Sequence, residues 1–148
     1  MILSGRDIKW YIETKKLVVT PVEEKQFRQN GIDLYLEDVD LERADNGHKY
    51  LNFSGFVLGA TRERLELPDD LMAFVELRST FARKGLLIPP TIVDAGFKGN
   101  LTIELWHCRS QQAPLGELVF HLIFAKTSSP CVPYDGKYQN QSGITGAL

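Results

Sequence analysis

Short runs of apolar residues, many of them alternating with polar ones, recur along most of the chain. This pattern predicts strands, because successive side chains of a strand point to opposite faces of a sheet. Pieces rich in Gly, Pro, Asn and Asp separate the runs and predict turns. Many short strands with almost no long helical pattern predict an all-β barrel or double-sheet fold. The predicted strands cover residues 17–20, 32–36, 53–60, 72–77, 101–106 and 118–125.

The start of the chain differs from the rest, because its apolar residues recur at helical spacing. Ile8, Tyr11 and Ile12 lie three or four positions apart. Ser4 can cap a helix there, and Asp7, three residues later, suits the positive end of the helix dipole. We therefore predict a short N-terminal helix.

Length and charge narrow the function classes. A chain of 148 residues fits one domain, which we expect to span residues 1–148. A net charge of −2 gives no basic field for general nucleic-acid binding. The apolar run 118–125 is too short to cross a bilayer, and the start lacks a signal-peptide pattern. Cys108 and Cys131 make no disulfide framework, so we expect a cytoplasmic protein. From the charge and the short apolar runs we expect no nucleic-acid or membrane partner.

Residues 128–148 form a C-terminal tail of different composition. The tail has too much proline and glycine for a core strand, yet too many aromatic residues for a plain disordered segment. Two interpretations follow. The tail either becomes ordered over a ligand or packs on a neighbouring subunit.

The segment 77–85 follows a predicted strand and holds two hydroxyl groups and three cations. If it coils helically, Ser79 and Arg83 fall on one face at positions i and i+4. Unpaired backbone N–H groups and a guanidinium group would then favour a phosphate. The alternative is a basic turn in contact with solvent.

The strand that begins at Leu101 carries a carboxylate on its polar side. Alternation places Leu101, Ile103 and Leu105 on one face and Thr102, Glu104 and Trp106 on the other. Glu104 therefore shares a face with a hydroxyl group and an aromatic ring. Such a carboxylate is either half-buried and suited to proton transfer, or simply an exposed strand residue.

The sequence gives little support to a metal held by the protein. His48, His107 and His121 have no ligand spacing, and His121 lies in an apolar strand, where a hydrogen-bonded histidine is the expected role. Zinc-dependent nucleobase deaminases need an H-x-E motif and a P-C-x-x-C motif. Around Cys131 the chain supplies one cysteine alone, so we expect no zinc site. The P-loop, G-x-G-x-x-G and G-x-S-x-G motifs are missing as well, and nothing supports a Ser-His-Asp triad.

Five segments of the chain carry recognisable motifs: 1–8 (MILSGRDI), 30–34 (NGIDL), 78–85 (RSTFARKG), 94–104 (DAGFKGNLTIE) and 134–141 (YDGKYQNQ). Taken in this order, they resemble the dCTP deaminase branch of the dUTPase superfamily, most closely its archaeal-type deaminases. The resemblance runs nearly end to end. It implies a distorted jelly-roll or dUTPase-like (β-clip) barrel, a homotrimer with active sites at subunit interfaces, and Mg²⁺ bound through the substrate triphosphate.

The resemblance also implies residue roles. Glu104 would be the general acid and base of zinc-independent deamination of dCTP, oriented by Arg83. Ser79 would bind water or phosphate, and Asp94 the deoxyribose 3′-hydroxyl group. The 128–148 tail would cover the nucleotide. The implied substrate-binding residues are Arg78, Thr80, Thr102, Ile103, Tyr134, Lys137 and Gln141.

Departures from the family pattern leave three functions open. The stretch 79–94 is shorter than in typical deaminases, and Pro89-Pro90-Thr91 stands where they have an H-x-T-A-like piece. His121 stands where the superfamily often has Gln. The first function is a dCTP deaminase, with or without hydrolysis of dUTP to dUMP. The second is a dUTPase, in which the counterpart of Asp94 activates water, and the third is a non-catalytic nucleotide- or protein-binding module.

Overall fold

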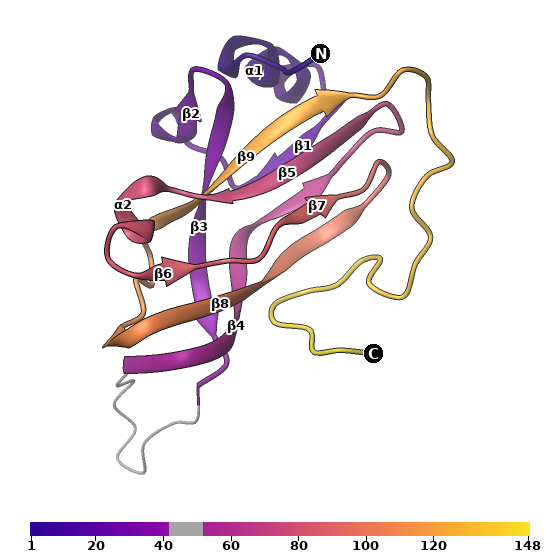
Figure 1. Ribbon diagram of the computed structural model, residues 1–148. Coiled ribbons are helices and arrows are strands. Elements are labelled where there is room, and N and C mark those ends of the chain that lie inside the picture. The colour runs from indigo at the N-terminus through magenta and orange to yellow at the C-terminus, as the bar shows by residue number, and fades with distance from the viewer. Residues whose placement is uncertain (42–51) are drawn as a thin grey trace.

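The computed structural model describes residues 1–41 and 52–148 and is built almost entirely from strands (Figure 1). His48, for which we expected no metal role, lies outside the described residues. The described elements are α1 (Gly5–Glu13), β1 (Val18–Thr20), η1 (Glu24–Gln26), β2 (Phe27–Arg28), β3 (Gly31–Val39), β4 (Asn52–Glu66), β5 (Leu71–Leu77), α2 (Ser79–Ala82), β6 (Leu86–Leu87), β7 (Thr91–Val93), β8 (Lys98–Gln112) and β9 (Leu118–Lys126).

The predicted N-terminal helix is confirmed, with the predicted cap. The Asp7 backbone N–H donates to the Ser4 hydroxyl over 3.1 Å, and the Asp7 carboxylate accepts from the Ser4 backbone N–H. This reciprocal pair satisfies two backbone donors that a helix start otherwise leaves free. Ile8 is completely buried and anchors α1 to the core.

All six predicted strands exist, but two are much longer than predicted. β4 and β8 each have 15 residues and pair antiparallel from Asn52–Gln112 to Glu66–Lys98. The pattern missed their ends because polar residues dominate there and the pairing is maintained by the backbone. β4 and β8 lie side by side in one half of the sheet (Figure 1).

The strands form one curled sheet in the order β6-β8-β4-β3-β9-β5-β7, with β1 on β4 and β2 on β3. β3 joins the two halves, since its first part pairs with β9 and its last part with β4. The sheet folds over a core that includes Leu34, Leu36, Leu65, Phe120 and Phe124, all fully buried. The all-β prediction is confirmed. No helix of the described part could span a membrane.

The first half of β3 is buried on both faces. Ile32 and Leu34 face the apolar core, while Asp33 and Tyr35 on the other side are also buried, at 1% and 6% exposure. The sequence predicted the strand but not the burial of its second face by other side chains. Polar side chains from neighbouring elements provide it, so the buried polar atoms of β3 have hydrogen-bond partners.

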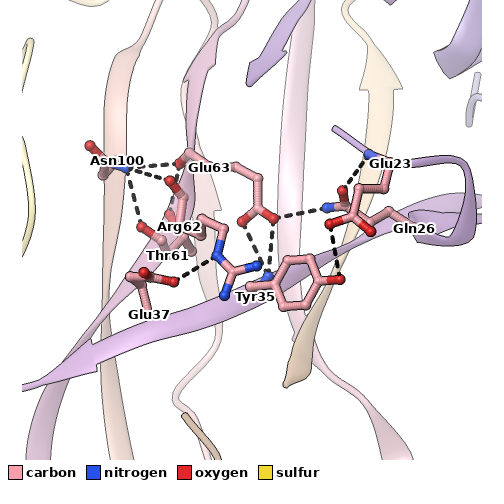
Figure 2. Close-up of polar contacts among 8 residues, drawn as sticks. All are labelled: Glu23, Gln26, Tyr35, Glu37, Thr61, Arg62, Glu63 and Asn100. Carbon is pink, nitrogen blue, oxygen red and sulfur yellow. Dashed lines mark hydrogen bonds and ion pairs between the residues drawn. The ribbon is translucent and has the colours of Figure 1, made fainter. Parts of the chain in front are cut away.

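A β-bulge in β4 brings a buried glutamate beside Tyr35 (Figure 2). Between Ala60 and Arg64 the register with β8 shifts, and the Asn100 amide donates to three backbone carbonyls there at 3.1–3.2 Å. Glu63, within this bulge, is fully buried and accepts hydrogen bonds from the Tyr35 backbone N–H and the Gln26 amide. Bulges of this kind redirect side chains near functional sites.

Candidate functional site

A pocket of about 490 Å³ opens beside β8, bordered by β4, β5, β7 and the C-terminal tail. Its volume lies within the range of small-molecule sites, roughly 300–1,000 Å³. Residues that line it include six of those that the sequence indicated: Asp94, Thr102, Ile103, Glu104, Tyr134 and Gln141. Residues far apart in the sequence therefore meet here.

β8 places Glu104 in the wall of this pocket. Leu101, Ile103 and Leu105 are buried, whereas Thr102 and Glu104 between them are half-buried, as the alternation predicted. Across the sheet, Leu58 of β4 is the register partner of Glu104. Glu104 is therefore half-buried and not an exposed strand residue, while its role in proton transfer stays a prediction. It has an apolar neighbour on one side and the open pocket on the other.

Asp94 follows β7 at the pocket rim, in a turn that requires glycine. The Phe97 backbone N–H donates to the Asp94 carbonyl over 3.1 Å, which closes the turn. Gly96 has a φ of +81°, and a Cβ there would lie 2.6 Å from Pro133 of the tail. Only glycine tolerates both this backbone conformation and this close approach. The D-x-G part of the motif thus brings the Asp94 carboxylate and the tail to the same rim.

The last part of the tail runs beside β8 of its own chain (Figure 1). Tail residues line one side of the pocket. The Asn100 N–H donates to the Gln141 carbonyl over 3.0 Å, and the Gln141 amide donates to the Asn100 carbonyl over 2.7 Å. Further along, the Thr145 N–H donates to the Thr102 hydroxyl. Tyr134 lies with its ring centroid 5.9 Å from that of Phe97. The tail lines the pocket of its own chain, and both earlier interpretations, ordering over a ligand and packing on a neighbouring subunit, stay predictions.

The segment with Ser79 and Arg83 lies elsewhere. It forms α2, a single turn in which the Arg83 N–H donates to the Ser79 carbonyl over 2.9 Å. The side chains of Ser79, Thr80 and Arg83 are exposed, and none of them lines the pocket. Figure 1 shows α2 at the side of the sheet away from the tail. One copy of the chain therefore does not bring Ser79 and Arg83 to Glu104.

Two further predicted binding residues make contacts outside the pocket. Lys137 donates through its Nζ to the Leu148 carbonyl. Arg78 donates through Nη1 to the Leu118 carbonyl over 2.9 Å, and its Nε lies 3.2 Å from the Asp33 carboxylate. Arg78 is thus fixed at the start of α2.

Sequence reasoning missed the buried cluster around Asp33. His121 Nδ1 lies 2.8 Å from one carboxylate oxygen, and Arg28 Nε lies 2.5 Å from the other. Burial would raise the pKa of Asp33, but the hydrogen bonds from His121 and Arg28 and the charge of Arg78 outweigh it, so the pKa lies below its usual value. His121 is hydrogen-bonded, as expected. The G-x-D-L element contained the signal, but it did not reveal the partners of Asp33.

Among residues 1–41 and 52–148, no group of three or more His, Cys, Asp or Glu side chains could hold a metal ion. The pocket itself offers two carboxylates, Asp94 and Glu104. One or two carboxylates can supplement a Mg²⁺ ion held mainly by phosphate oxygens.

Comparison with known proteins identifies close relatives. Residues 37–127 match the sequence profile of the dCTP deaminase-like family. A protein named probable deoxyuridine 5′-triphosphate nucleotidohydrolase, from Sulfolobus islandicus rod-shaped virus 1, is 51% identical, with 98% of this chain and 97% of that protein aligned. A dCTP deaminase from Metallosphaera sedula is 45% identical over 98% of this chain and 96% of its own.

The fold also matches a solved structure. The 2′-deoxycytidine 5′-triphosphate deaminase from Agrobacterium tumefaciens superimposes with a TM-score of 0.61 at 17% identity. The match covers 83% of this chain and 47% of that one. The expected fold of the superfamily is therefore confirmed.

Proposed function

Since the chain belongs to the dCTP deaminase-like family, we propose that it deaminates dCTP to dUTP in the pocket beside Glu104. The observation that carries this proposal is the position of Glu104, half-buried in the wall of a pocket that Asp94 and the tail also line. A zinc-free deaminase needs such a carboxylate to move protons. The pocket volume of about 490 Å³ accommodates a nucleoside.

In the proposed reaction, water adds to C4 of cytosine and ammonia leaves. Glu104 takes a proton from the attacking water and passes it to the ring nitrogen N3, then takes the proton of the new C4 hydroxyl group and passes it to the departing amino group. The products are dUTP and ammonia, so no other reactant is needed. Backbone groups of Thr102, Ile103 and Glu104 would contact the base, and Asp94 the 3′-hydroxyl group.

A second copy of the chain would supply Ser79 and Arg83 to this pocket. An exposed apolar row supports such an interface, since Leu87, Trp106 and Phe56 are neighbours across β6, β8 and β4 and remain 50%, 51% and 56% exposed. Exposed rows of large apolar side chains mark interaction surfaces. Trp106 also shares a face with Glu104. We therefore propose a homotrimer with its active sites between subunits.

The triphosphate would lie against the α2 region of that second copy. The residues proposed to bind the triphosphate are Arg78, Ser79, Thr80 and Arg83. Closure of the tail would add Tyr134, Lys137 and Gln141. Mg²⁺ bound to the phosphate oxygens would neutralise part of their charge.

Cys108 and Cys131 are free and exposed, which supports the expected cytoplasmic location.

A second candidate is hydrolysis of dUTP to dUMP and pyrophosphate, alone or in addition to deamination. It is favoured by the 51% identity to a viral relative that is named as a dUTP nucleotidohydrolase. In this reaction Asp94 would activate the water that attacks the α-phosphate, and Glu104 would not be required. A non-catalytic binding module is the remaining alternative.

One assay separates the three functions. The protein is incubated with dCTP or dUTP and Mg²⁺, and the products are resolved by chromatography. Formation of dUTP and ammonia identifies a deaminase, whereas dUMP and pyrophosphate identify a dUTPase. An absence of turnover with both nucleotides identifies a binding module.

Glu104→Gln tests the role of this carboxylate. We expect deamination to fall by about a hundredfold or more, since a general acid and base contributes roughly 10²–10⁴ in rate. The affinity for dCTP, measured by calorimetry, should change less than about threefold, because the amide keeps the size and shape of the side chain. A variant that deaminates at the wild-type rate would refute the assignment.

A further inference from the structure

Asp33 is a buried carboxylate that three side chains share. Its side chain is 1% exposed and contacts Arg28 Nε at 2.5 Å, Arg78 Nε at 3.2 Å and His121 Nδ1 at 2.8 Å. A buried charge is tolerated when its partners are held in good geometry. The carboxylate therefore fixes the orientation of two guanidinium groups at once. His121 completes the set through the other oxygen.

These guanidinium groups keep donors for another ligand. Each has five N–H donors in a planar fork. Arg28 uses its Nε on Asp33, and among residues 1–41 and 52–148 its two terminal nitrogens donate no hydrogen bond. The Arg28 and Arg78 side chains are 37% and 33% exposed, so both reach solvent. Two cations against one carboxylate leave a local positive charge on a chain whose net charge is −2.

The cluster adjoins the segment to which the proposed function assigns the triphosphate. Arg78 directly precedes α2, which carries Ser79 and Arg83. Arg28 ends β2, and β2 pairs with the start of β3, two residues before Asp33. The shared carboxylate thus places a second fork next to Arg78, from a part of the chain about 50 residues away along the sequence.

We propose that Arg28 binds the polyphosphate end of the substrate together with Arg78, and that Asp33 and His121 position the two guanidinium groups. The inference rests on the proposed function, because it assumes that the α2 region receives the triphosphate. Neither the motifs nor the family resemblance indicated Arg28. Two forks fixed side by side match oxygens on adjacent phosphates, so they favour a triphosphate over a monophosphate.

A purely structural role would have a different signature. Arg28 could serve only to hold β2 against β3, in which case its loss would lower stability and leave ligand affinity unchanged. The experiment therefore measures both quantities. Inorganic tripolyphosphate is a suitable probe, because its binding requires neither the base nor turnover.

The central variant is Arg28→Gln, with Arg28→Lys as the conservative change. We expect Arg28→Gln to weaken tripolyphosphate binding and raise the KM for dCTP by about tenfold or more, as loss of a charged hydrogen bond predicts. The kcat and the affinity for dCMP should change less than about threefold, because chemistry and base binding occur elsewhere. The tripolyphosphate affinity and the KM for dCTP of Arg28→Lys should lie between those of the wild type and of Arg28→Gln, since lysine keeps the charge but lacks the planar guanidinium group.

Arg109→Gln is the matched control. Arg109 is exposed on β8, outside the cluster, and its loss removes the same charge. It should leave tripolyphosphate affinity and the KM for dCTP unchanged. If Arg109→Gln binds tripolyphosphate as weakly as Arg28→Gln does, the effect is one of general charge and the inference is overturned.

Failure of this inference is distinct from failure of the proposed function. If the wild type converts dCTP or dUTP while Arg28→Gln keeps its KM and its tripolyphosphate affinity within about twofold, only the role of Arg28 is refuted. If the wild type turns over neither nucleotide but binds tripolyphosphate through Arg28, only the catalytic function is refuted. If the wild type shows neither turnover nor tripolyphosphate binding, both the inference and the proposed function are refuted.

Discussion

The buried carboxyl group of Glu63 makes the stability of the protein depend on pH near neutrality. Glu63 is fully buried, and burial raises its pKa from 4.5 to about 7, against hydrogen bonds from Tyr35 and Gln26 that favour the charged form (Figure 2). In the unfolded chain the group would return to its ordinary pKa. The folded protein therefore holds a proton that the unfolded chain releases between these two pH values.

The direction of the effect follows from proton binding. Below pH 4.5 both states are protonated, and Glu63 imposes no electrostatic cost. As the pH rises to 7, the unfolded chain loses this proton first, so the free energy of unfolding falls. The difference between the two pKa values corresponds to about 3 kcal/mol, which is reached near pH 7 and stays constant above it.

Glu63→Gln isolates this contribution, because an amide does not titrate. The amide oxygen can replace Oε1 and keep the hydrogen bond from Gln26, but the amide N–H₂ at the position of Oε2 then faces the Tyr35 N–H donor, which costs about 1–3 kcal/mol at every pH. This cost is constant, whereas the ionisation cost of the wild type grows with pH. We therefore expect the variant to gain about 3 kcal/mol in unfolding free energy relative to the wild type between pH 4.5 and 8.

Urea denaturation at a series of pH values measures this difference. Protein concentration is held fixed, because assembly would otherwise shift the apparent stability. Glu37→Gln is the control, since Glu37 is an exposed carboxylate that pairs with Arg62 in the same cluster at 2.7 Å. The other titrating groups, including Glu23, Lys25 and Asp33, are common to both proteins and cancel in the difference. A difference curve for Glu63→Gln that is flat across this pH range would refute the reasoning.

The tail and the proposed site between subunits give two further predictions. Removing the residues after Tyr134 should lower kcat by about tenfold or more while the urea transition remains cooperative, because the tail lies at the pocket and outside the core; an unchanged kcat would favour a packing role. Mixing inactive Glu104→Gln and Arg83→Gln proteins under conditions that exchange subunits should restore about a quarter of the sites, since hybrid interfaces then combine an intact Glu104 with an intact Arg83. Activity that stays at the level of the separate variants would place both residues in one chain.

Local sequence patterns predicted the features that depend on near neighbours. Ser4 and Asp7 form the helix cap within three positions, and the alternation around Glu104 is maintained by the strand itself. Both could be predicted because one residue spacing determines which side chains face each other. The all-β fold followed from the same reasoning, applied repeatedly along the chain.

Contacts across distant strands could not be predicted in the same way. Asp33 meets His121 because β3 pairs with β9 in one register, 88 residues apart, and a shift by one position would turn Asp33 away. Glu63 is buried because a bulge, stabilised by the Asn100 amide, changes the register of β4. These features depend on pairing and on irregularities that no periodic pattern encodes.

The separation of charges in one chain supports a site that two copies complete. Asp94 and Glu104 line the pocket, while Arg28, Arg78 and Arg83 gather near α2. In the proposed trimer, the cations of another copy would bind the triphosphate and orient the Glu104 carboxylate after assembly. Opposite charges on the two faces would also favour the correct register between subunits.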